Sequence, residues 1–481
     1  MSTTTSTTDH LDDVHHRRRW LALTVISAAS LMVVLDASVV NIALPRAQEA
    51  LGLTDANRQW AVTAYALTFG GLLLLGGRVA DFLGRKRAFL ISLIGFAVAS
   101  AIGGAAATDV MLFGARALQG VFAAVLAPAA LSLVAATFTD HRELARAFGV
   151  YGAVQGAGGA VGLILGGLLT EFVSWRWCLY INVPIALVTL LVAIPALRES
   201  RTAGERRYDV PGALLVTLGA GLLVLGFTNA AEGGGWADTS TLVTIALAVV
   251  LLIAFVLVER KVSAPLLPMR LVWHRDRGGA FALSALVGAG MFGMLLFLAY
   301  YLQVDLGMTP LAAGLAFLPF SAGIIVTAMV ASALLPKLGA KTLMVGGTAI
   351  ATVGMLLLSR IDGQSTWLTG VLPGEVIVSL GLGLVFAPLN AVALTRIDPG
   401  DSGVASAMVN TTQQLGGALG TALLNTTFAS VAIGVAAHAG TEPGGALEGY
   451  RMVFLLAGCL FALAALVAAI VMGRGSATLA S

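Results

Sequence analysis

The sequence predicts an all-α integral membrane protein with fourteen transmembrane helices, and three observations lead to this fold class. Of the 481 residues, 58% are hydrophobic and 11% are charged, whereas a soluble domain carries about 25% charged residues. Apolar runs of about 17–25 residues, the length that crosses a bilayer as a helix, recur along the whole chain. Basic residues are concentrated in alternate loops. This composition argues against a soluble enzyme, a nucleic-acid-binding protein and a disordered scaffold.

The predicted spans form three groups of six, two and six helices. The first group is predicted at 20–44, 58–77, 88–107, 110–136, 147–170 and 177–197. The second group is predicted at 210–230 and 240–259. The third group is predicted at 280–302, 311–335, 342–360, 367–394, 403–432 and 451–472. The expected domains are a cytoplasmic tail (1–19), an N-terminal six-helix bundle (20–197), a linker with two additional helices (198–279), a C-terminal six-helix bundle (280–472) and a second cytoplasmic tail (473–481).

The distribution of Lys and Arg predicts the orientation. Of the 28 Lys and Arg residues, 22 fall in loops on one predicted side, five fall in the opposite loops, and Arg116 lies within a span. Because loops rich in Lys and Arg stay in the cytoplasm, both termini are expected there. An error of one in the number of spans would break this alternation midway along the chain.

The two groups of six spans are predicted to be copies of each other. The pattern Q-x-x-G-G-A-[V/L]-G occurs at 155–162 and again at 413–420, and an Ala-Pro pair occurs at 127–128 and again at 387–388. Both copies begin on the same side, so they are parallel repeats related by a pseudo-two-fold axis along the membrane normal. Transporters built in this way bind substrate near the midplane, between the halves. No pore loop or filter signature points to a channel.

Three charged residues are predicted inside the membrane: Asp36, Arg116 and Glu375. Such residues are costly in a bilayer and persist where they are paired or functional. Asp36 and Arg116 are expected at a similar depth, so they either form a static ion pair or a proton-binding site. Glu375 either meets a cationic substrate or a second proton, or lies nearer the outer interface in contact with water.

Two glycine-containing patterns accompany these charges. The loop after the second span contains Gly77, Asp81, Gly84 and Arg85. A simple cytoplasmic anchor would explain its basic residues but not an Asp between two glycines. The fifth span carries glycines whose spacing lets helices approach closely. They are Gly158, Gly162, Gly166 and Gly167.

These motifs resemble those of the major facilitator superfamily, and in particular its fourteen-span drug:proton antiporters. The motifs are G-x-x-x-D-x-x-G-R-K at 77–86, R-x-x-Q-G at 116–120, the glycine series at 149–167, L-D-A-S-V-V-N-I-A-L-P at 35–45, W-R-W at 175–177 with N-V-P at 182–184, and Y-L-Q at 301–303 with Pro310 and Gly314. The resemblance extends over essentially the whole chain. The sequence departs from the family pattern at Leu163, where Pro is usual, at Phe82, where Arg is frequent, and at Gln413, where Arg is common.

The resemblance implies the major facilitator fold and a proton-coupled antiporter that exports lipophilic or cationic small molecules by alternating access. Asp36 would bind the proton, and Arg116 would tune its protonation. Apart from the resemblance, the charge of Glu375 within a span makes it a further candidate for proton coupling. Gly77, Asp81, Gly84 and Arg85 would form a cytoplasmic gate, and the four glycines of the fifth span would shape the interface between halves. The expected partners are a small-molecule substrate, protons and lipid, without nucleic acid, cofactor or metal. The protein is expected to be a monomer in the bacterial inner (plasma) membrane.

Aromatic, Met and amide side chains in the spans are candidates for substrate contacts, because they suit an apolar, adaptable pocket. They are Asn41, Tyr65, Gln155, Met291, Phe292, Phe297, Tyr300 and Gln303. Three other functions stay open at this point. One is a dedicated exporter of a single endogenous metabolite, antibiotic or lipid-like compound, and another is a proton-coupled uptake symporter. A membrane enzyme is the least expected, because the six His residues form no ligand set.

Overall fold

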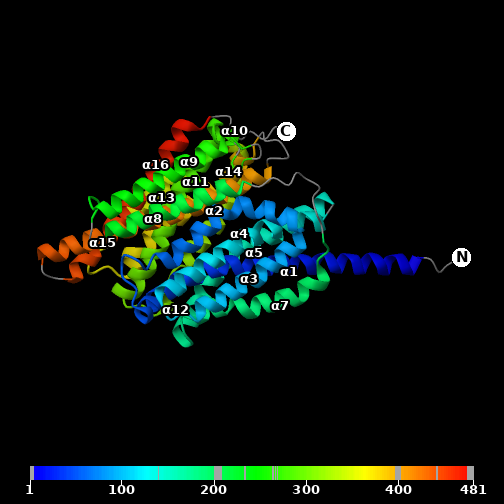
Figure 1. Cartoon of the computed structure of the whole chain (residues 1–481), viewed down its shortest axis with the longest axis horizontal. Helices are drawn as coiled ribbons and strands as arrows, with labels where there is room; N and C mark the ends of the chain where they lie inside the picture. Colours follow the sequence, from blue (N-terminus) through cyan, green and yellow to red (C-terminus); the bar gives the residue numbers. More distant parts are fainter. Residues whose placement is uncertain are drawn as a thin grey trace.

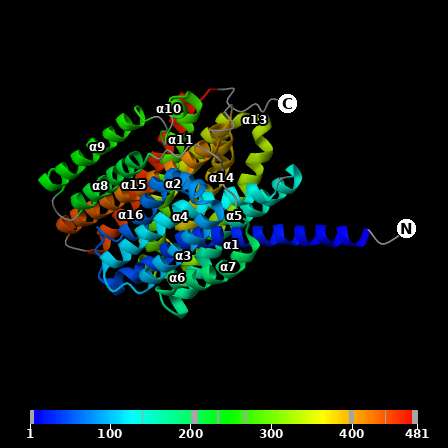
Figure 2. The ribbon, with the colours of Figure 1, turned by 45° about the vertical axis from the view of Figure 1, so that its right-hand side comes forward.

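The structure is a computed structural model that describes residues 5–138, 140–199, 209–231, 235–262, 265, 267, 269–395, 402–439 and 442–473. Within these ranges the regular secondary structure is helical (Figure 1). The first helix extends well beyond the rest of the molecule at its N-terminal end in both ribbon views (Figure 1, Figure 2). The helices that precede the inserted hairpin form one bundle, and the helices that follow it form a second bundle.

Seven helical segments build the N-terminal bundle. They are α1 (Thr5–Leu51), α2 (Trp60–Leu83), α3 (Arg85–Gly104), α4 (Asp109–Thr137), α5 (His141–Phe172), α6 (Trp177–Tyr180) and α7 (Asn182–Ala196). α1 packs along α5, and α2 and α3 pack along α4. The span predicted at 177–197 therefore consists of two segments, α6 and α7.

The C-terminal bundle repeats this arrangement. Its segments are α11 (Arg275–Tyr300), η2 (Tyr301–Asp305), α12 (Pro310–Ala316), α13 (Leu318–Leu358), η3 (Trp367–Val371), α14 (Leu372–Leu394), α15 (Ser402–Ala439) and α16 (Glu442–Val471). α11 packs along α15 as α1 does along α5, and α13 packs along α14 as α2 does along α4. The predicted internal duplication thus appears as equivalent helix pairs.

α13 contains two membrane spans joined by a reversal at Gly339. A straight helix of its 41 residues would be about 62 Å long, far more than a bilayer requires. Gly339 instead has a φ of 76° and a ψ of 157°, which only glycine adopts readily. Thr327 before the break contacts Gly383 of α14, and Gly347 after it contacts Gly381. Two residues so far apart in sequence reach the same turn of α14 because the chain folds back.

The structure therefore has fourteen spans in its described residues. Thirteen helices are long and apolar enough to cross a membrane, and one of them contains both arms of the α13 hairpin. The predicted number of spans and the all-α membrane fold are confirmed. The helix ends differ from the prediction chiefly at α1, which begins at Thr5, at α16, which begins at Glu442, and at α15, which continues to Ala439.

The inserted hairpin contacts both bundles. It consists of α8 (Val210–Asn229) and α9 (Thr239–Glu259), and the short α10 (Met269–Val272) follows. α8 packs against α2 of one bundle and α15 of the other, whereas α9 packs mainly against α8 (Figure 2). The Thr228 hydroxyl accepts hydrogen bonds from Gln59 Nε2 (3.0 Å) and Trp60 Nε1 (3.2 Å). The Thr426 hydroxyl of α15 donates to the Phe227 carbonyl (2.8 Å).

The two bundles are bonded to each other at one end of the molecule. We call the end that carries Arg78, Arg85, Lys86 and Arg87 the basic end, and the other the opposite end. At the opposite end, Gln303 Nε2 donates to the Ile42 carbonyl (3.1 Å) and Asn425 Nδ2 to the Asp55 carbonyl (2.8 Å). The Leu311 backbone N–H donates to the Glu171 carboxylate (3.0 Å). These bonds, made from η2, α12 and α15 to the N-terminal bundle, close the opposite end.

Candidate functional site

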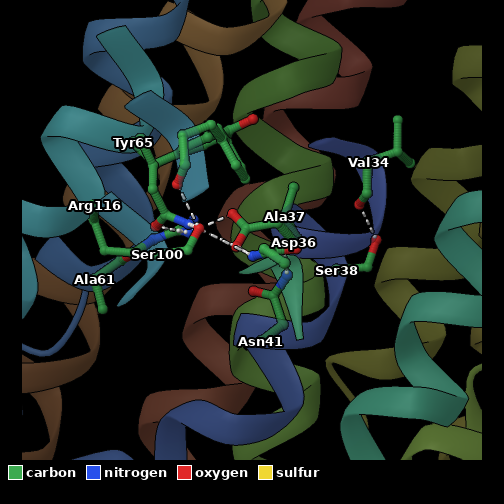
Figure 3. A network of polar contacts seen from close by, with 12 residues as sticks. Val34, Asp36, Ala37, Ser38, Asn41, Ala61, Tyr65, Ser100 and Arg116 are labelled. Carbon is green, nitrogen blue, oxygen red and sulfur yellow. Dashed lines mark hydrogen bonds and ion pairs between the residues drawn. The ribbon is translucent and has the colours of Figure 1, made fainter. Parts of the chain in front are cut away.

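The candidate site is centred on an ion pair buried between α1 and α4. Arg116 Nη1 lies 2.5 Å from Asp36 Oδ2. The side chain of Asp36 is fully buried and that of Arg116 is 1% exposed. Figure 3 shows the two groups meeting inside the N-terminal bundle. The expected match in depth between these charges is therefore a direct contact.

Two amide side chains and a hydroxyl complete the network around Asp36. Gln119 Nε2 donates to Asp36 Oδ1 (2.8 Å), and Asn182 Nδ2 donates to the same oxygen (2.7 Å). Both amides also donate to the Ser100 hydroxyl, at 2.8 and 3.3 Å. Gln119, Asn182 and Ser100 are fully buried. The Asp36 carboxyl thus accepts bonds from three donors on α4 and α7.

Arg116 is held in place on its other sides. Its Nε donates to the Ala61 carbonyl of α2 (2.8 Å), and its Nη1 also donates to Gln119 Oε1 (2.8 Å). Its guanidinium carbon lies 4.6 Å from the centre of the Tyr65 ring, a cation–π contact. The buried Tyr65 hydroxyl has no hydrogen-bond partner among the described residues. Tyr65, expected as a substrate contact, is therefore part of the charge network.

The chemistry available to this network is reversible protonation. Removing two opposite charges from water is costly, and their mutual attraction compensates only while they remain in contact. A proton can replace the guanidinium as the partner of the carboxylate, since a neutral carboxyl group needs no cation. The role of Asp36 and Arg116 in proton coupling stays a prediction.

Glu375 lies at a second buried position, in the first turn of α14. Its side chain is fully buried, and neither carboxylate oxygen has a hydrogen-bond partner within the described part of the chain. The polar groups near its carboxylate are the Phe320 backbone and the Trp367 side chain. The alternative in which Glu375 is exposed to water is wrong for this conformation. Its role stays a prediction.

The turn at the basic end joins α2 to α3 and is tied to α7. Arg85 Nε lies 3.4 Å from the Asp81 carboxylate. Glu199 accepts a bond from the Lys86 backbone N–H (3.2 Å) and lies 3.8 Å from Arg87. The turn itself needs Gly84, whose φ is 95°. Gly77 contacts Pro128 of α4. Glu199, which the sequence did not single out, anchors this turn.

We expect Gly84→Ala to lower the stability of the protein by about 1–3 kcal/mol, because a side chain is strained at this φ. An added Cβ would also lie 2.5 Å from Glu199 Oε1. Gly114→Ala is a matched control, since nothing lies within 4 Å of its added Cβ. Thermal unfolding of the purified protein would measure both. Equal melting temperatures for the two variants would contradict a strained turn.

The glycines of α5 contact mainly α1. An added Cβ would meet Leu31 and Val34 at Gly158, Leu35 and Ser38 at Gly162, and Val39 at Gly166. Gly167 alone among these four faces the other bundle, at Pro310 and Leu311 of α12. Three of the four therefore shape packing within the N-terminal bundle and not the interface between halves. The helical spacing of the glycines predicted a face of small residues but did not predict which helix packs against that face.

The other predicted substrate contacts do not form one pocket. Asn41 Nδ2 donates to the Ala37 carbonyl of its own helix, and Gln155 Nε2 to the Tyr151 hydroxyl (Figure 3 shows Asn41). Gln303 bonds across the bundles, as described above. Met291 and Phe292 of α11 are partly buried; Phe292 covers Gly417 of α15. Phe297 and Tyr300 are buried beside Arg58 at the opposite end.

The described residues contain no group of three or more His, Cys, Asp or Glu side chains that could hold a metal ion.

The sequence profile of the Major Facilitator Superfamily matches residues 26–421. The chain belongs to this superfamily. Its spans, its duplicated bundles and the motifs around Asp36, Asp81 and Arg116 are those of a multi-pass membrane transporter of this family.

Relatives with functional names match nearly the full length of the chain. A puromycin resistance protein, pur8, of Streptomyces alboniger is 50% identical over 435 residues, which are 90% of this chain and 86% of that protein. The cephamycin export protein CmcT of Amycolatopsis lactamdurans is 39% identical over 440 residues, 91% of this chain and 90% of that protein. A lincomycin resistance protein of Streptomyces lincolnensis is 32% identical over 448 residues, 92% of this chain and 89% of that protein.

Solved structures share the fold at low sequence identity. A bacterial homolog of the human lysosomal transporter Spinster aligns with a TM-score of 0.68 and 15% identity, covering 93% of this chain and 96% of that chain. A D-xylose-proton symporter aligns with a TM-score of 0.65 and 15% identity, covering 96% of this chain and 99% of that chain. These superfamily members support the fold alone.

Proposed function

We propose that this protein exports drug-like or antibiotic small molecules from the cell in exchange for protons. The observation that carries the proposal is the buried Asp36–Arg116 pair and its donor network. Named relatives that confer antibiotic resistance or export an antibiotic support the direction of transport and the class of substrate. Asp36 is the proton-binding acid in this proposal, and Arg116 is the cation that competes with the proton.

The proposed cycle follows from this competition. With the opposite end closed, Asp36 is ionised and paired, and the substrate enters from the basic end. Opening the opposite end moves α1 relative to α4, so the carboxyl group loses its guanidinium and takes up a proton from that side. The protonated carboxyl group carries no charge during the return, and the Arg116 guanidinium retains only its hydrogen bonds to the Ala61 carbonyl and Gln119. Restoring the pair at the end of the cycle expels the proton on the other side.

The remaining features have proposed places in this scheme. The basic end faces the cytoplasm, with both chain termini, in the plasma membrane of a bacterium. Asp81 and Arg85 act as a gate there, together with Gly77 and Gly84. Glu375 either binds a second proton or meets a cationic substrate. The protein functions as a monomer and needs no cofactor beyond the proton gradient.

A dedicated exporter of one antibiotic is the second candidate. The names of three relatives, for puromycin, cephamycin and lincomycin, each refer to a single antibiotic. A multidrug resistance protein, Stp, of Mycobacterium tuberculosis, 31% identical over 417 residues, favours the broader range. Only the breadth of substrates distinguishes the two candidates.

The experiment that tests the proposal uses purified protein in liposomes with an imposed pH gradient. We expect several chemically different antibiotics and dyes to move across the liposome membrane in the direction opposite to the protons. Addition of each compound on one side should drive protons across the membrane toward that side. Movement of one compound alone would favour the dedicated exporter. Movement in the same direction as the protons would show a symporter and overturn the proposal.

A further inference from the structure

A buried cation occupies a cluster of aromatic rings at the opposite end. Arg58 lies in the loop between α1 and α2, and its side chain is 4% exposed. Its guanidinium carbon lies 3.9 Å from the centre of the Tyr300 ring, 5.1 Å from that of Phe428 and 5.7 Å from that of Phe297. We call the rings of Phe297, Tyr300, Phe428 and Tyr450 the aromatic box.

The rings of the box support one another. The ring centres of Phe428 and Tyr450 are 4.9 Å apart, and those of Phe297 and Phe428 are 5.2 Å apart. Tyr450 also meets Tyr301 at 5.4 Å. Such spacings are typical of stabilising aromatic pairs. The box is therefore a preformed structure, built from α11, α15 and α16 of the C-terminal bundle.

Arg58 fills the box with few hydrogen bonds. Its Nη1 contacts the Asp55 carboxylate at 2.9 Å, and the Gln48 side chain at 3.5 Å. Its Nε and Nη2 have no hydrogen-bond partner among the described residues. The guanidinium lies over aromatic rings, so its attraction to the box depends on its charge, while its ionic partner Asp55 lies outside the box. A site of this kind accepts organic cations of different shapes.

The cation and the box belong to different bundles. Arg58 is part of the N-terminal bundle, whereas every ring of the box comes from the C-terminal bundle. Separation of the bundles at this end withdraws Arg58 and leaves the rings without their cation. Asp55 lies in the same loop as Arg58 and leaves with it, whereas Asp305, which interacts with Tyr450, belongs to the C-terminal bundle and stays beside the box. The vacated box would combine aromatic faces with nearby negative charge.

We propose that the aromatic box is a cation-binding subsite on the exit path, and that Arg58 and an exported organic cation occupy it alternately. Arg58 holds the opposite end closed while it fills the box. When the bundles separate, the departing cation replaces it, and the return of Arg58 displaces that cation to the outside. This inference rests on the proposed export of small molecules and adds their charge and a place where they bind.

Equilibrium binding of tetraphenylphosphonium to the full chain in lipid nanodiscs, without a gradient, tests the inference. Arg58→Gln empties the box of charge, and Arg58→Lys is the matched control that keeps it. We expect Arg58→Gln to bind the probe at least about fivefold more tightly than the wild type, and Arg58→Lys to stay within about twofold. Neutral triphenylphosphine oxide should bind all three proteins equally.

A second series in the Arg58→Gln background tests the rings themselves. Cation–π attraction is strongest for Trp, so Phe428→Trp should tighten binding of the probe and Phe428→Leu should remove the gain. If Arg58→Gln does not fold, Arg58→Met, which fills the box with an uncharged chain, takes its place in both series. Equal binding by the neutral and Lys variants, or no effect of Phe428→Leu, would overturn the inference.

The outcome can be separated from the fate of the proposed function. If the wild type exchanges drugs for protons in liposomes but the variants bind the probe alike, the box is not a subsite and the exporter stands. If the box binds the probe as expected but no compound moves against the proton flow, the box stands as a cation site and the exporter fails.

Discussion

Asp36→Asn is expected to abolish proton-driven export, and it leaves the Arg116 guanidinium without its carboxylate, so the protein should also be less stable. The Asn side chain has nearly the shape of Asp but cannot bind and release a proton. Gln119 and Asn182 can still donate to its carbonyl oxygen, so this part of the hydrogen-bond network is kept. Drug movement in inside-out vesicles would measure the effect, with and without a pH gradient. We expect no response to the gradient.

A matched control is available at Asp238. This residue is partly exposed at the start of α9 and caps the helix by accepting a hydrogen bond from the Ser240 N–H. Asn is as good as Asp at this position of a helix, so Asp238→Asn should transport like the wild type. Substrate exchange without a gradient should persist in Asp36→Asn. A variant that still responds fully to the pH gradient would remove Asp36 from the proton pathway.

Arg116→Gln is expected to stop transport and to destabilise the protein by about 3–5 kcal/mol, the usual cost of leaving one member of a buried ion pair alone. Asp36 would keep its two amide donors but lose its only ionic partner in the described network. Gln at 116 also ends the cation–π contact with Tyr65. Denaturant or thermal unfolding in detergent would measure the loss.

The double variant Asp36→Asn/Arg116→Gln separates the charge pair from general packing. With both charges gone, neither is left without a partner. The free energy of unfolding should therefore fall by at least about 1 kcal/mol less than the sum of the losses in the two single variants. Transport should stay absent, because no proton-binding acid remains. Additive losses in the double variant would show that the two residues do not depend on each other.

Charge was the feature of the site that the sequence revealed most directly. Asp36 and Arg116 stand out because ionised groups are rare in an apolar span. Ser100, Gln119 and Asn182 do not stand out, since uncharged polar residues are frequent in such helices and their partners depend on helix packing. Gln119 and Asn182 did lie within recognised motifs, which was the available signal. Ser100 had none.

Topology was predictable where length and loop charge constrain it. The two arms of α13 were predicted as separate spans, because a basic loop with Gly339 interrupts the apolar run. Contacts between distant segments were not predictable. Phe297 and Tyr300 were recognised as aromatic residues suited to a binding site, but their partner Arg58 lies in a loop more than two hundred residues earlier.

The position of α8 affects how an apolar molecule can reach the transport path from the bilayer. α8 lies against α2 and α15, with Ala220 and Val224 packed into the seam where the two halves adjoin. Along this contact α8 covers the place where α2 and α15 meet, so an apolar molecule in the bilayer cannot pass between those two helices there. The hairpin also contacts both bundles, so under the proposed alternating access it would have to move with one of them or slide along it. Its flexibility would then set a mechanical limit on turnover.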